Sequence, residues 1–334
     1  MELDRISNLP SEVIAKLLSH LSVREAVRTS VLSRKWRYRS AMLPHLVFDH
    51  QCVSTRAYKL VVNIVDHVLL GHIGPTHKFK LSHVGGVATW DIDLWILHLS
   101  RNSIKEFILE IRQGFNYTIP SCLFSSQDMI HLDLLGCVLK LPSTFKGFRN
   151  LKSLVFQRVT LAQVGFQNLI ACCPLLERLT LLDFPFPILK IEAPNLQFLY
   201  VQGDFEDVIF ENTLNLLDVC IDSEVGRRWV SDRSSNVVKF LVHLPHIQKF
   251  DIVGFSLQGD RGIGVLVWPA DQESQAAWSE VKFLYGNRVF SLTQLRLVKI
   301  SYIYDCKPEL DFIRFLLLNS PVLEKMIVKP SSPR

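Results

Sequence analysis

The segment from Gly259 to Gly264 is the first candidate for chemistry, because closely spaced glycines can bring backbone amides near a phosphate. Its glycines lack the spacing of a dinucleotide or phosphate loop, and no strand–helix unit precedes them. The adjacent Cys172 and Cys173 suggest a metal site, but neighbouring side chains diverge and no further His or Cys stands at ligand spacing. We therefore expect neither segment to bind a cofactor or a metal.

Other catalytic signatures are missing as well. Four histidines are spread evenly rather than paired at i and i+4 of one helix, namely His67, His72, His77 and His83. The sequence contains no G-x-S-x-G elbow and no H-E-x-x-H motif. The sequence thus predicts a non-catalytic protein, and a hydrolase or transferase is the least favoured interpretation.

The composition of the whole chain predicts a folded protein with a large core. Of 334 residues, 48% are hydrophobic and 21% are charged, which excludes wholesale disorder and a collagen-like chain. The length suggests two ordinary domains or one elongated array. An acidic start (Glu2 and Asp4), the lack of a membrane-length apolar stretch and seven scattered cysteines predict a soluble protein of the nucleus or cytoplasm.

Positive charge is concentrated near the beginning of the chain. Residues 1–44 contain eight basic and four acidic side chains, whereas the net charge of the whole chain is only +5. An acidic protein partner would explain this excess, and so would simple solubility. Nucleic acid is a less favoured partner, because the pairs Arg34–Lys35 and Arg227–Arg228 do not extend into a basic stripe with aromatic residues.

Residues 6–39 have the pattern of three short helices. Val13, Ile14, Leu17, Leu18 and Leu21 fall on one apolar stripe behind the helix-starting Pro10. Ser22 and Glu25 have the spacing of a capping box, which predicts that the second helix begins there. The third helix is expected over residues 31–39. Three short helices enclose only a small core, so this unit either caps the next domain or docks on a partner.

The same segment resembles a plant F-box. The resemblance rests on ISNLPSEVI at residues 6–14, LLSHL at 17–21 and AVRTSVLSRKWR at 26–37. It implies that the segment docks on a Skp-type adaptor, which joins it to a cullin–RING ubiquitin ligase. Carried over by position, it makes eight residues adaptor-facing or motif-core residues: Leu9, Pro10, Ile14, Leu18, Leu21, Val27, Leu32 and Trp36. The resemblance favours a docking module over a simple cap.

An irregular repeat follows. The pattern apolar-x-x-apolar-x-apolar begins at nine positions: Ile104, Met129, Leu151, Leu176, Leu196, Leu214, Ile247, Leu292 and Leu323. The first five intervals lie in or near the range of leucine-rich repeats. A proline precedes the first apolar position by two residues in four units, at Pro174, Pro194, Pro245 and Pro321. Because PLLERLTL at 174–181 also matches PVLEKMIV at 321–328, we predict units of a helix or turn, a proline stop and a strand.

These repeats resemble the degenerate leucine-rich repeats that follow plant F-boxes. The expected fold is therefore α/β, a short trihelical F-box followed by an irregular leucine-rich-repeat solenoid with a parallel β-sheet on its concave face. The run LDFIRFLLLNSPVLEKM at 310–326 is similar to the FBD region that often closes such proteins. We expect an F-box at 1–45, linking helices and a first strand at 46–100, repeats at 101–254, an irregular insertion at 255–291, and final FBD-like repeats at 292–330.

Two further local patterns complete the expected layout. Tyr58–Leu70 has helical spacing, and Phe79 with Leu81 indicates a first strand ahead of the nine. Gly254–Gly264 and the polar run Asp271–Glu280 predict one long loop.

Outward strand positions are the candidates for target recognition. They are Glu110, Asp133, Val155, Thr180, Phe198, Tyr200, Asp218, Asp251 and Arg296. Tyr200 with Phe198 is the best aromatic anchor, since aromatic side chains supply contact area at low entropic cost. The resemblance and the two-part layout together predict the substrate receptor of a cullin–RING ligase. A scaffold acting outside any ligase is the first alternative, and a nucleic-acid-binding protein is the second.

Overall fold

Two compact units make up the chain, Met1–Cys173 and Pro174–Arg334. A computed structural model describes residues 9–32, 36, 39–49, 58–83, 89–112, 116–184, 186, 188–203, 207–222, 241, 244, 246–253, 291–303 and 307–330. The long loop expected over Gly254–Gly264 and Asp271–Glu280 lies outside these residues, as does the Arg227–Arg228 pair.

The first unit begins with the expected short helices. These are α1 (Ser11–Ser19), α2 (Val23–Arg28) and the 3₁₀ turns η1 (Thr29–Val31) and η2 (Ser40–Met42). The predicted capping box is confirmed, because Ser22 Oγ accepts from the Glu25 amide at 3.3 Å while Glu25 Oε2 accepts from the Ser22 amide at 3.0 Å. Most of the third helix expected over 31–39 lies outside the described residues.

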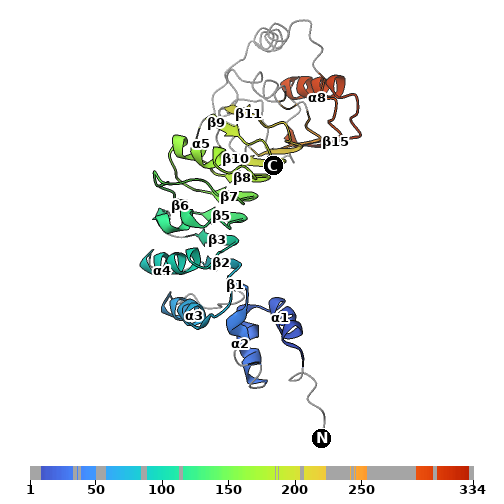
Figure 1. Ribbon diagram of the computed structural model, residues 1–334. Helices are drawn as coiled ribbons and strands as arrows, with labels where there is room; N and C mark the ends of the chain where they lie inside the picture. Colours follow the sequence, from blue (N-terminus) through green and yellow to red (C-terminus); the bar gives the residue numbers. More distant parts are fainter. Residues whose placement is uncertain are drawn as a thin grey trace, which may run out of the picture. The chain divides into compact units, whose positions relative to one another are not determined.

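The first unit continues as a parallel sheet with helices on one side (Figure 1). Its strands run in the order β1 (His45–Phe48), β2 (Lys78–His83), β3 (Glu106–Ile111), β5 (His131–Leu135) and β7 (Ser153–Gln157). Its helices are α3 (Tyr58–Gly71), α4 (Thr89–Ser100), the 3₁₀ helix η3 (Ser121–Ser125) and α5 (Gln163–Ala171). The expected helix near 58–70 and strand near 79–81 are confirmed, and α4 is a second helix in the segment where linking helices were expected. The strand near 79–81 is not the first of the sheet, because β1 precedes it.

Two rows of apolar side chains form the core beneath this sheet. The register aligns Phe79, Phe107, Leu132 and Leu154 in the first row and Leu81, Leu109, Leu134 and Phe156 in the second. All eight side chains are at most 3% exposed. The rings of Phe79 and Phe107 stack with centroids 5.9 Å apart. The alternation of apolar residues therefore packs one sheet face into the core, as the repeat pattern predicts.

The second unit repeats this arrangement. Its parallel strands are β8 (Arg178–Leu182), β10 (Phe198–Gln202), β12 (Asp218–Asp222), β13 (Lys249–Val253), β14 (Leu297–Ile303) and β15 (Lys325–Pro330). The helix α8 (Lys307–Asn319) precedes β15 and buries Phe312 and Leu316. The expected order of helix, Pro321 and strand is confirmed for this last repeat.

The register corrects the repeat pattern at two positions. Val219 pairs with Leu199, so this repeat begins at the buried Leu216 and not at Leu214, which is 65% exposed. Val298 likewise pairs with Phe250, so the next-to-last repeat begins at Leu295 rather than Leu292. In both segments several leucines stand close together, and the sequence pattern alone fits more than one starting point.

Some connections between strands are extended rather than helical. Short strands form two small parallel sheets, β4 (Tyr117–Thr118) with β6 (Cys137–Val138) and β9 (Ile188–Glu192) with β11 (Asp207–Glu211). Residues 185–194 contain three prolines, which exclude a helix in that connection. The repeat between β8 and β10 therefore differs from the expected unit of helix or turn, proline and strand, because β9 takes the place of the helix.

Candidate docking helices and outward strand face

Helix α1 has an inner and an outer apolar face. Ile14 and Leu18 are buried (0% and 1% exposed), whereas Val13 and Leu17 are 42% and 47% exposed. Pro10 begins the helix, and its carbonyl accepts from the amide of Ile14 at 3.1 Å. A single apolar stripe in the sequence therefore serves two surfaces, one packed inside the chain and one open to a partner.

Helix α2 and η1 add further exposed apolar side chains. The capping box fixes the start of α2, and the hydrogen bonds from Ser22 hold the pKa of Glu25 below its usual value. Val23 and Ala26 point inward and are buried. Val27 is 44% exposed, and Leu32, just after η1, is 52% exposed.

The eight residues that the F-box resemblance assigns to the adaptor surface or the motif core fall into a buried and an exposed group. Ile14, Leu18 and Trp36 are buried at 4% exposure or less, so they pack inside the chain. Leu21, Val27 and Leu32 are at least 38% exposed and are available to a partner, Pro10 is exposed, and Leu9 is half-buried. Contact of any of them with an adaptor stays a prediction.

Other exposed apolar residues of this segment were not singled out from the sequence. Val13, Leu17, Val31 and Met42 are 42%, 47%, 85% and 47% exposed. Val13 and Leu17 belong to the apolar stripe predicted for α1, so that stripe was the signal that could have included them among the partner-facing residues. Seven large apolar side chains between residues 13 and 42 are thus open to solvent, which makes this segment a candidate interaction surface.

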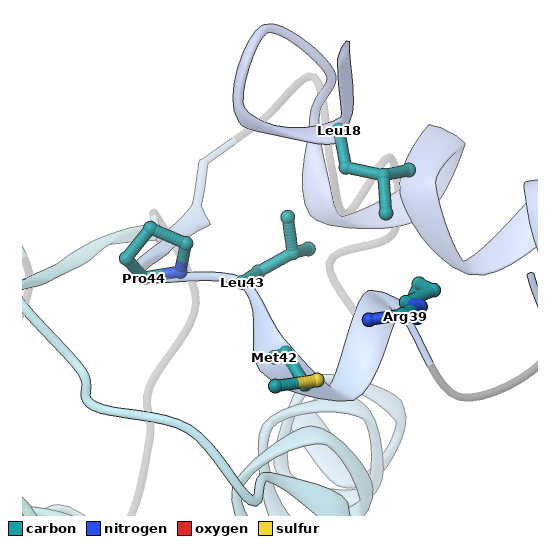
Figure 2. A pocket seen from close by; sticks show the side chains of 5 residues that line it. All are labelled: Leu18, Arg39, Met42, Leu43 and Pro44. Carbon is teal, nitrogen blue, oxygen red and sulfur yellow. The ribbon is translucent and has the colours of Figure 1, made fainter. Parts of the chain in front are cut away.

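A small cavity lies next to these helices (Figure 2). Leu18 of α1 and the segment around η2 line it, namely Arg39, Met42, Leu43 and Pro44. Its volume is about 100 Å³, well below the size of ordinary small-molecule sites. Its lining is apolar apart from Arg39 and contains no group for acid–base chemistry.

The outward strand face of the first unit is the sheet face opposite its core rows. On β2, β3, β5 and β7 it consists of Lys78, Lys80, Ser82, Glu106, Ile108, Glu110, His131, Asp133, Leu135, Ser153, Val155 and Gln157. The candidates Glu110, Asp133 and Val155 therefore share one surface. This face carries charged, polar and aliphatic side chains.

Ion pairs neutralise both glutamates of this face. Glu106 pairs with Lys78 at 2.8 Å. Glu110 pairs with Arg112 at 2.8 Å and with Lys80 at 3.4 Å, and it accepts a hydrogen bond from Ser82 Oγ at 2.7 Å. Burial alone would raise the pKa of Glu110, but these partners hold it below its usual value.

Asp133 is different from these glutamates. Among the described residues, no hydrogen bond or ion pair reaches its half-buried carboxylate. Burial and the neighbouring Glu110 raise the pKa of Asp133 to about 6, although Lys80 opposes this shift. The carboxylate is therefore charged at neutral pH in surroundings that disfavour the charge.

The strand face of the second unit carries its own polar contacts. The guanidinium carbon of Arg178 lies 4.1 Å from the centre of the Phe198 ring, and Lys249 pairs with Asp218 at 2.8 Å. Tyr200 donates to Asp222 at 3.0 Å.

Four of the candidates in this unit lie on β8, β10 and β12, namely Thr180, Phe198, Tyr200 and Asp218. Asp251 lies on β13 and pairs with Lys299 at 2.9 Å. Arg296 instead precedes β14 and pairs with the exposed Glu324 at 2.6 Å.

The histidines and cysteines form no evident metal centre in the part of the chain that the structure describes, where no group of three or more potential ligands is positioned for a metal. His72 Nε2 lies 2.8 Å from the Leu43 carbonyl, a contact between two loops. Cys172 caps the end of α5, and the buried Cys173 follows it. Burial raises the pKa of the Cys173 thiol to about 11, so it stays protonated.

None of the helices in the described segments combines the length and the apolar character needed to cross a bilayer.

Comparison with known proteins identifies the family. The F-box domain model matches residues 6–47, the model of the LRR repeats of FBD-associated F-box protein At5g56370 matches 92–259, and the FBD model matches 291–328. F-box/FBD/LRR-repeat protein At1g13570 of Arabidopsis thaliana is 36% identical over 383 aligned positions, covering 98% of this chain and 91% of the relative. The chain belongs to the F-box/FBD/LRR-repeat family.

Further members of this F-box group are similar over shorter spans. F-box/LRR-repeat protein At3g59210 of Arabidopsis thaliana is 31% identical over 90% of this chain and 63% of its own length. F-box/FBD/LRR-repeat protein At3g52680 of the same plant is 32% identical over 60% of this chain and 46% of its own length. The F-box, the repeats and the FBD region inferred from the sequence are thus confirmed. The F-box implies a Skp-type adaptor as partner and supports a role as a ubiquitin-ligase adaptor in general.

Proposed function

We propose that this protein is the non-catalytic substrate-recognition subunit of a cullin–RING ubiquitin ligase. The helices α1, α2 and η1 bind a Skp-type adaptor, and the outward strand faces hold a target protein. Its contribution is proximity, since a held target meets the ubiquitin-charged enzyme far more often than a free one. The protein acts in the nucleus or the cytoplasm, where such ligases work.

The observation that carries this proposal is the set of exposed apolar side chains in the F-box segment. Leu17, Val27 and Leu32 are each between 44% and 52% exposed, while the inner faces of the same helices are already packed. Covering such side chains is favourable by about 25 cal/mol for each Å² removed from water. A protein partner provides that cover, and the matched F-box says which kind of partner it is.

The test is the affinity of the full chain for a purified Skp-type adaptor. We expect Val27→Asp to weaken the complex at least about 100-fold, because it places an unpaired charge in a desolvated contact. Leu9→Ala combined with Pro10→Ala is expected to weaken it as well. The thermal midpoint of each variant shows whether it is still folded.

A matched control lies outside the F-box segment. Val164 lies on α5 and is 67% exposed, so Val164→Asp makes the same substitution as Val27→Asp on a different helix. We expect this variant to bind the adaptor as the wild type does. Equal losses in Val164→Asp and Val27→Asp would contradict the assigned docking surface. A folded wild type that never binds the adaptor would contradict the ligase role and favour a scaffold.

A further inference from the structure

Asp133 occupies the middle of the outward strand face of the first unit. In the register of the sheet, Ile108 on β3 and Val155 on β7 flank it in the same row. Leu135 lies two residues further along β5, on the same face. Ile108 and Leu135 are only 8% and 7% exposed. Aliphatic side chains thus occupy three of the four positions next to Asp133 on this face, and His131 occupies the fourth.

The charged groups around Asp133 compensate its negative charge only in part, because Lys80 lowers its pKa by less than burial and Glu110 raise it. On β3, Glu106 and Glu110 are held by Lys78, Lys80 and Arg112. On its own strand the nearest titratable group is His131, whose pKa is lowered by burial, so this imidazole is neutral at physiological pH. The positions on β7 that face β5 in the register, Ser153, Val155 and Gln157, carry no charge.

The surroundings of Asp133 favour a basic side chain over other kinds of ligand. An anion would be repelled by Asp133, and a purely apolar group would bury the carboxylate without a partner, which costs free energy. A metal ion needs several ligands, and the described residues do not supply three at one point. Lysine and arginine combine an aliphatic stem, which fits Ile108 and Leu135, with a charged head that can pair with the carboxylate.

We propose that Asp133 binds a lysine or arginine side chain of the target protein, with the aliphatic stem of that side chain packed on Ile108, Leu135 and Val155. This inference rests on the proposed function, because it names the chemistry of the target at the strand face. It makes Asp133 a specificity-determining residue, since a target without a basic side chain at this point leaves a buried charge unpaired.

The experiment uses the full chain bound to a Skp-type adaptor and immobilised through that adaptor. The probes are pools of twelve-residue peptides whose central residue is Lys, Arg, acetyl-lysine or Glu and whose other positions are mixtures of neutral residues. We expect the Lys and Arg pools to be retained about tenfold better than the acetyl-lysine pool, because acetylation removes the charge and keeps the stem. The Glu pool should be retained least.

The variant Asp133→Asn should abolish the preference for Lys over acetyl-lysine. Asp128 provides a matched control, since it is an exposed aspartate in the turn before β5, and Asp128→Asn should keep the preference. Equal retention of the Lys and acetyl-lysine pools by the wild type, including no retention of either, would overturn the proposal. So would a preference that survives Asp133→Asn.

Adaptor binding is measured in the same samples. If the complex with the adaptor is intact while the pools are not distinguished, the inference on Asp133 fails and the proposed ligase role stands. If the adaptor is not bound at all, the proposed function itself fails.

Discussion

At the scale of single residues, Asp133 is held in surroundings that oppose its charge. Burial is the main reason that its pKa is raised to about 6, and the carboxylate of Glu110 adds to the effect. Two of its neighbours in the register, Ile108 and Val155, cannot donate a hydrogen bond from their side chains. A half-buried charge without a partner lowers the free energy of unfolding, and binding sites often contain such destabilising residues.

This argument predicts the effect of Asp133→Asn on stability. A raised folded-state pKa means that the aspartate favours the folded state fully at low pH and loses that contribution as the pH rises through about 6. The neutral amide avoids this loss, so at pH 7.5 we expect the variant to be more stable by about 1 kcal/mol, a figure reduced for partial exposure. The difference should shrink between pH 6 and pH 4. Urea unfolding at several pH values measures it, and a variant less stable at pH 7.5 would contradict the account.

The docking residues show what could be predicted at this scale and what could not. The apolar stripe of α1 was evident in the sequence, but Ile14 and Val13 are adjacent and equally apolar. Only packing against the rest of the unit decides that Ile14 is buried while Val13 is 42% exposed. Residue type predicts that such a helix is amphipathic, and the neighbouring elements determine which residues remain for a partner.

At the scale of elements, the strands were predicted well where one leucine pattern fits and poorly where two fit. The stretch from Leu214 to Leu217 offers three leucines, and the sequence pattern selected the wrong one. A second signal was available, because an asparagine directly precedes the first core leucine at Asn150, Asn195 and Asn215. Its presence before Leu216 indicates the register that the structure shows.

These asparagines join successive turns of the repeat. Asn195 Nδ2 donates to the Pro174 carbonyl at 2.8 Å, and Asn215 Nδ2 donates to the Pro194 carbonyl at 2.8 Å. In the first unit, Asn150 Nδ2 donates to the Gln127 carbonyl at 3.2 Å. Each bond satisfies a carbonyl in the turn of the previous repeat.

We therefore expect Asn195→Ala to destabilise the protein by about 1 kcal/mol, the usual worth of one such hydrogen bond. The matched control is Gln197→Ala, which removes an exposed amide two residues away. Urea unfolding compares the two free energies of unfolding. If Gln197→Ala costs as much as Asn195→Ala, the asparagine bond is not the cause.

The bounds of α4 and the presence of β1 could not be predicted, for physical reasons. Helix α4 is apolar on several sides, with Trp90 and Leu94 exposed and Trp95 and Leu99 buried, so no single stripe stands out. Strand β1 has only four residues, too few for an alternation to be distinctive. In both cases the neighbours in the fold, and not the local sequence, decide the structure.

At the scale of the whole molecule, the adaptor surface and the Asp133 site both belong to the first unit. The adaptor surface lies on the helices that precede β1, and Asp133 lies on β5. β1 and β5 are separated by three steps in the sheet, through β2 and β3. Neighbouring strands are about 4.8 Å apart, so β5 lies about 14 Å from β1, the strand that follows the adaptor-binding helices.

Sites at this separation without shared partners usually act independently, which predicts nearly additive effects. We expect Asp133→Asn to change the affinity for the adaptor by less than about twofold, a coupling below about 0.5 kcal/mol. Because binding free energies are linked reciprocally, bound adaptor should change the preference for Lys peptides by no more than the same factor. Titration of the wild type and the variant with adaptor, each with and without the Lys pool, measures both quantities. A change of fivefold or more in either would show that the helices and the strand face are coupled, and that adaptor binding regulates the capture of the target.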